Sequence, residues 1–91
     1  MDSNQAVSEL EELAKKLDIQ IVYDRLSGEG FSQGGLCKVK GVWKIIVERQ
    51  SSNTEKLTVL SRSLSRFDCD GIYMSPHVRA MIEKHKRSTT E

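Results

Sequence analysis

The sequence predicts a small α+β domain: a three-stranded antiparallel sheet with helices packed on one face, in the order helix, strand, strand, strand, helix, helix. Three segments carry apolar residues every three or four positions, which is the period of an amphipathic helix. Between the first two of these segments, apolar and polar residues alternate as they do in half-buried strands. At 91 residues the chain has room for one core, so we expect a single domain at 1–86 and a polar tail at 87–91.

The first helix is predicted from apolar residues that share one face, namely Val7, Leu10, Leu13, Ala14 and Leu17. The stretch DIQIVYD follows directly and alternates. It predicts a strand with Ile19, Ile21 and Tyr23 on its buried side.

The stretch LCKVKGVWKIIVER predicts a hairpin, and the length of its turn decides which side chains share a face. A two-residue turn at Lys40-Gly41 places Leu36 and Lys38 beside Trp43. A three-residue loop at 40–42, with Gly41 at a positive φ, groups only apolar residues on that face: Cys37, Val39, Trp43, Ile45 and Val47. We prefer the second register, which leaves Lys38, Lys44 and Glu48 on the wetter face.

Two more helices follow the hairpin. Ser52 and Glu55 form a capping-box pattern ahead of an apolar stripe made of Leu57, Leu60, Leu64 and Phe67. Ser75 and Pro76 fit the N-cap and first position of the last helix.

The glycine-rich run GEGFSQGGLCKVKG, residues 28–41, raises the question of a phosphate-binding loop. Such loops lead straight into a helix, whose free N–H groups bind the anion, whereas this run leads into a strand. We therefore interpret Gly28 and Gly30 as a flexible loop that could cover a groove. Gly34 and Gly35 are expected to begin a strand that twists sharply or approaches another backbone closely.

Composition narrows the classes of protein and the kinds of site that the sequence allows. The chain is 37% apolar and 30% charged, as in ordinary soluble proteins, and it contains no apolar run long enough for a membrane span or secretory signal. Two cysteines, Cys37 and Cys69, are typical of reduced thiols in a cytosol. His77 and His85 are too far apart on one helix to share a metal ion. No catalytic residue, metal site or cofactor is predicted.

Charge is unevenly distributed along the sequence. Residues 1–35 hold seven acidic groups and three basic ones, a balance of −4, and residues 36–91 hold eleven basic groups and six acidic ones, a balance of +5. Five cations form a candidate binding surface: Lys38, Lys40, Lys44, Arg62 and Arg66. If they share one surface, they could bind a nucleic-acid backbone with strong salt dependence.

From about Leu10 to Phe67 the chain resembles the small zinc metallopeptidases of the ImmA/IrrE type, through LDIQIVYDRL, KGVWKIIVER and the helix that follows. Where that family has LAHELGH, this chain reads LSRSLSR, so Arg62 and Arg66 stand at the histidine ligands and Ser63 at the glutamate. The resemblance therefore implies a non-catalytic relative. The chain also resembles a short bacterial family with a GGLC strand and an FD..GIY..P.VR portion, to which we attach no activity.

The leading functional hypothesis is a cytoplasmic, non-catalytic module, a monomer or small oligomer, that binds a protein or peptide partner. A three-stranded sheet has two edges, and an open edge beside an apolar groove can accept an extended peptide. Nucleic-acid binding through the lysine-rich hairpin and helix arginines is the alternative. An enzyme that uses carboxylates or Cys37 ranks third.

Overall fold

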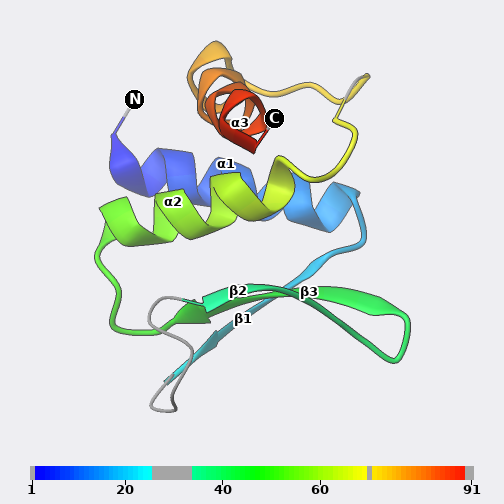
Figure 1. Cartoon of the computed structure of the whole chain (residues 1–91). Coiled ribbons are helices and arrows are strands. Elements are labelled where there is room, and N and C mark those ends of the chain that lie inside the picture. Colours follow the sequence, from blue (N-terminus) through cyan, green and yellow to red (C-terminus); the bar gives the residue numbers. More distant parts are fainter. Residues whose placement is uncertain (1, 26–33, 70, 90–91) are drawn as a thin grey trace.

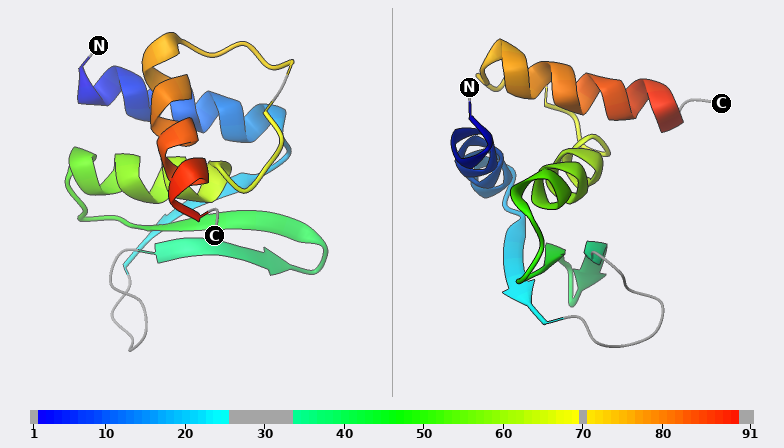
Figure 2. Two further views of the ribbon diagram at one scale, coloured as in Figure 1. Left: turned by 45° about the horizontal axis from the view of Figure 1, so that its top comes forward. Right: turned by 90° about the vertical axis from the view of Figure 1, so that its left-hand side faces the viewer.

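The computed structural model describes residues 2–25, 34–69 and 71–89, and its elements follow the predicted order. They are α1 (Ser3–Lys16), β1 (Gln20–Asp24), β2 (Gly34–Val39), β3 (Val42–Glu48), α2 (Asn53–Leu64) and α3 (Pro76–Thr89). The predicted α+β class is confirmed. The helix α1 and the helix α2 lie side by side on one face of the sheet, and α3 crosses over them on the side away from the sheet (Figures 1 and 2).

Local sequence signals set where each helix begins. The Asp2 carboxylate accepts a hydrogen bond from the Gln5 amide at 2.8 Å and caps α1. Both hydrogen bonds of the predicted capping box at Ser52 and Glu55 are present at the start of α2. The Ser75 hydroxyl accepts from the Val78 amide at 3.3 Å, and α3 begins at Pro76 as expected.

The core lies between the sheet and the two helices on it, and it continues beneath α3. Its most buried large side chains come from all three layers: Leu10, Ile45, Val47, Leu60, Leu64 and Val78. Trp43 and Phe67 close the hairpin end of this core, with ring centroids 5.4 Å apart in an edge-on arrangement. Among the described residues, no helix is long and apolar enough to cross a bilayer.

The sheet is mixed rather than antiparallel, which corrects the sequence-based expectation. Its strand order is β1-β3-β2, with β1 parallel to β3 and β2 antiparallel to β3. The segment 25–33 between β1 and β2 is long enough to place β2 on the far side of β3. The most apolar strand, β3, thereby takes the centre, where both of its edges are paired.

The preferred hairpin register was wrong, because the turn contains two residues. Val39 pairs with Val42, and Lys40 and Gly41 between them have φ of 52° and 81°. Two positive φ values define a type I′ turn, whose twist matches that of the strands. Leu36 and Lys38 therefore share the helix-facing side of the sheet with Trp43. The ammonium of Lys38 lies 5.2 Å from the Trp43 ring, which accommodates a lysine at the rim of the core.

This turn gives a stability prediction. Lys40→Asn is expected to raise the free energy of unfolding by about 0.5 kcal/mol, because asparagine tolerates a positive φ better than lysine does. Gly41→Ala is expected to lower it by about 1 kcal/mol, purely through backbone strain, since a Cβ at this position would meet nothing within 4 Å. Urea unfolding of the two variants measures both effects. Equal destabilisation by both substitutions would contradict the turn assignment.

The other face of the sheet carries no helix within the described part of the chain (Figure 1). The strand register places Val22, Cys37, Lys44 and Ile46 there, opposite the helix-facing side chains. The sheet is therefore covered on one face, and the described termini and helices all lie on the same side of it.

Candidate functional site

The five predicted cations do not share one face of the sheet. Lys38 is on the helix-facing side, Lys40 is in the turn, and Lys44, which pairs with Cys37, is on the opposite face. Arg62 and Arg66 are exposed, in the last turn of α2 and just after it. Trp43 packs against Phe67 beneath Lys38, so this ring is not free to stack on a base.

The glycine residues are only partly described. Gly28 and Gly30, the candidate flexible loop, lie outside the described residues, whereas Gly34 and Gly35 begin β2 as expected. A Cβ built on Gly35 would meet nothing within 4 Å, so no backbone approaches closely there, contrary to one of the two expected roles.

The helix segment LSRSLSR presents its residues to different surroundings. Ser63 is 5% exposed, whereas Arg62 and Arg66 are exposed to solvent. Among the described residues, no group of three or more histidine, cysteine or carboxylate side chains is placed to hold a metal ion. Cys69 is buried and its thiol points to the carbonyls of Leu64 and Phe67. Cys37 is half-buried on the open sheet face.

A groove of about 430 Å³ runs along the outer edge of β1, between this strand and α1. We call it the edge groove. It is lined by residues Ile19 to Tyr23 of the strand segment and by Glu11 and Lys15 of α1. Its volume falls within the range of sites that bind ligands, and Ile19, Ile21 and Val22 make much of its lining apolar.

The backbone of β1 offers hydrogen bonds to this groove. The Asp24 carbonyl accepts from the Arg49 amide at 2.8 Å, so Asp24 directs its polar groups toward β3. Because these groups alternate along a strand, Gln20 and Val22 also face β3, and Ile21 and Tyr23 direct their N–H and C=O groups outward. In the described part of the chain no strand pairs with this outer edge.

A second hollow, of about 340 Å³, continues beyond Tyr23. We call it the basic pocket. It is lined by Asn4, Val7, Ser8, Glu11, Tyr23, Arg49, Asn53 and Lys56. The amide of Asn53 donates to Ser3 Oγ at 3.2 Å and to Asn4 Oδ1 at 2.8 Å, which ties the beginning of α2 to the beginning of α1.

Tyr23 lies at the boundary of the two hollows and lines both. Its hydroxyl donates to the Glu11 carboxylate, and the Lys56 ammonium lies 5.4 Å from the centre of its ring. Burial, followed by this contact with Glu11, raises the pKa of Tyr23 well above its ordinary value. The phenol therefore stays protonated and holds β1 against α1.

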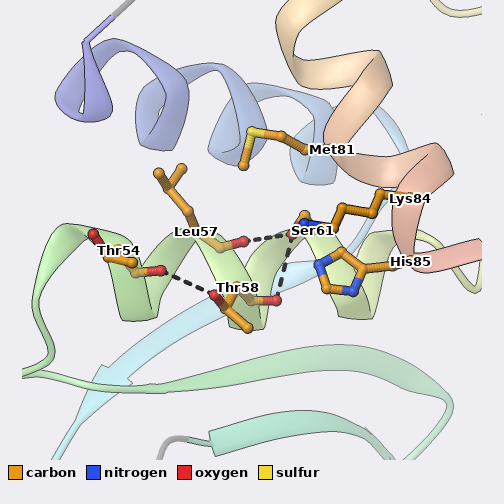
Figure 3. A pocket seen from close by; sticks show the side chains of 7 residues that line it. All are labelled: Thr54, Leu57, Thr58, Ser61, Met81, Lys84 and His85. Atoms are coloured by element: carbon orange, nitrogen blue, oxygen red, sulfur yellow. Dashed lines mark hydrogen bonds between the residues drawn. The ribbon is translucent and has the colours of Figure 1, made fainter. Parts of the chain in front are cut away.

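A third hollow, of about 210 Å³, lies between α2 and α3 (Figure 3). It brings Ser61 and His85 into one pocket, a pairing that sequence reasoning did not find. Burial, and then the charges of Arg62 and Lys84, lower the pKa of His85, so its imidazole is neutral at pH 7. The Ser61 hydroxyl nevertheless donates to the Leu57 carbonyl at 2.6 Å, and Ser61 is only 1% exposed. This arrangement satisfies a buried serine and gives no activated nucleophile.

Comparison with known proteins returns no match: no protein-family model fits the chain, and neither curated proteins nor solved structures give a significant similarity.

Sequence reasoning missed the edge groove and the basic pocket. The alternation of Ile19, Ile21 and Tyr23 correctly predicted a strand, but it could not show that this strand lies at an edge. Arg49 and Lys56 come together with Asn4 and Tyr23 only through the packing of α1 and α2 beside β1.

Proposed function

We propose that the chain is a non-catalytic peptide-binding module that adds an extended segment of a partner protein to its sheet, next to β1. The observation that carries this proposal is the outer edge of β1, which is unpaired within the described residues and lies along a largely apolar groove. Main-chain hydrogen bonds to Ile21 and Tyr23 would supply affinity, and the groove would supply selection among side chains.

The proposal also places the protein in the cytoplasm. Cys37 and Cys69 do not form a disulfide, and the buried Cys69 behaves as a small apolar residue of the core. Cysteines that stay reduced are typical of a reducing compartment.

The test is an amide-shift titration of the labelled protein with a blocked heptapeptide of alternating threonine and valine. We expect weak binding, with a Kd between roughly 10 μM and 1 mM, because a short flexible peptide loses much entropy on binding. Shifts should cluster on residues 19–23 and on Glu11 and Lys15. Shifts at Leu36 and Lys38 instead, on the outer edge of β2, would place the peptide at the other edge of the sheet.

Two results would contradict the proposal. Absence of shifts at millimolar peptide would remove peptide binding at this edge. Salt-sensitive shifts on the five cations with a single-stranded oligonucleotide, and none with peptide, would instead favour the nucleic-acid alternative.

A further inference from the structure

The edge groove and the basic pocket are adjacent, because Glu11 and Tyr23 line both. Their chemistry differs. Beside Ile21 the lining is mainly apolar, and beyond Tyr23 it contains the cations of Arg49 and Lys56 and the amides of Asn4 and Asn53. A ligand that follows β1 would therefore meet an apolar region first and a polar, basic region next.

The basic pocket has a net charge of +1, from two cations and the single carboxylate of Glu11. Glu11 already accepts the hydrogen bond of Tyr23, and Lys56 is placed over the Tyr23 ring. Within the described residues, no carboxylate forms an ion pair with the Arg49 guanidinium. Both cations are thus able to receive an external carboxylate without breaking an ion pair among these residues.

The alternation of side chains in a sheet fixes which ligand positions enter each region. The Ile21 and Tyr23 side chains point to the helix-facing side, in register with Ile45 and Val47. In an added strand, the residues beside Ile21 and Tyr23 point to the same side and are two positions apart. The first would lie against Ile19 and Ile21, and the second would point into the basic pocket.

We infer that the preferred ligand is an extended peptide segment with an apolar residue and an acidic residue two positions apart, whose carboxylate side chain is bound by Arg49 and Lys56. This inference rests on the proposed function, since it requires a strand added at β1. An acidic side chain suits this pocket because its methylene groups carry the carboxylate away from the peptide backbone and toward the two cations.

The experiment uses blocked heptapeptides of threonine and valine with a leucine at one position. A variable residue, glutamate, glutamine or lysine, stands two positions from the leucine, and each peptide is made with the pair in both orders. In one of the orders, glutamate should bind about five to ten times more tightly than glutamine at low salt. At about 0.5 M salt this advantage should fall below about twofold, because partly exposed charges are screened.

Protein variants identify the cations responsible. Arg49→Gln and Lys56→Gln should each reduce the glutamate preference to less than about half its value, while the affinity for the glutamine peptide stays unchanged. Arg66→Gln, which removes the same group from an exposed position outside both hollows, is the matched control and should leave the preference intact. Unfolding midpoints of the variants show whether each remains folded.

Failure of the acidic preference can be distinguished from failure of the proposed function. Equal affinity for glutamate and glutamine peptides, or tighter binding of the lysine peptide, would overturn the acidic preference and leave strand addition standing. Failure of every peptide to bind at millimolar concentration would contradict the proposed function, and the inference with it. A preference that persists in both Arg49→Gln and Lys56→Gln would place the carboxylate elsewhere.

Discussion

Ile45→Ala is expected to lower the free energy of unfolding by about 3 to 4 kcal/mol. Ile45 is 0% exposed, in the central strand, on the face covered by α1 and α2. Alanine removes buried methyl groups and leaves a cavity that the surrounding strands and helices cannot fully close. In a domain of this size the loss is a large share of the total stability, and urea unfolding measures it directly.

The neighbouring residue provides a matched control. Ile46 has the same side chain in the same strand, but it is only half-buried and points to the open face of the sheet. We expect Ile46→Ala to cost about 1 kcal/mol, because little packing is lost. Equal losses from the two substitutions would contradict an architecture in which, among the described residues, the helices cover the face that carries Ile45 and leave the face that carries Ile46 uncovered.

Ile21→Pro is expected to weaken binding of the threonine–valine peptide at least about tenfold, because proline removes an outward N–H donor and its ring occupies the edge. The ladder to β3 uses the polar groups of Gln20, Val22 and Asp24, so the substitution removes none of its donors. The amide-shift titration of the variant measures the loss. Ile21→Val keeps the donor and should bind as the original protein does, within about twofold.

The result for Ile21→Pro is informative only in a folded protein, which its amide spectrum establishes. Unchanged peptide affinity in the folded variant would show that the peptide does not pair with β1. If the variant is unfolded, heptapeptides methylated on single backbone nitrogens apply the same test without altering the protein.

The helices were predictable because their signals are local. The Ser52 and Glu55 pair is set by contacts within one turn, and Ser75 with Pro76 fixes the beginning of α3 in the same way. Each signal depends on residues at most a few positions apart, so the sequence alone contains the information needed.

The sheet was harder to predict because pairing joins distant residues. Ile21 and Ile45 become neighbours in a parallel pair, although a simple meander would pair β1 with β2. The hairpin register was ambiguous, because both registers placed apolar residues beside Trp43. The three-residue loop was preferred because it grouped only apolar residues on one face, but the two positive φ values of the Lys40-Gly41 turn place Lys38 beside Trp43 instead.

The candidate site was only partly predictable for the same reason, because it joins residues that are distant in the sequence. Tyr23 was assigned to the buried side of its strand. The structure places it on the helix-facing side, but at the exposed rim, against Glu11. Its position beside Arg49 and Lys56 depends on strand order and on how the two helices pack, which no local pattern encodes. The general idea of an open edge beside a groove could be predicted, whereas the edge itself and its charged end could not.

The most direct test of strand addition at β1 is a titration with heptapeptides that carry one backbone N-methyl group each, moved along the sequence one residue at a time. A methyl group on an amide that faces β1 removes a hydrogen bond and blocks close approach, whereas one on an amide that faces away does neither. We expect affinity to fall at alternate residues of the peptide and to be retained at the residues between them. Uniform affinity along the series, or equal loss at every position, would contradict strand addition at β1.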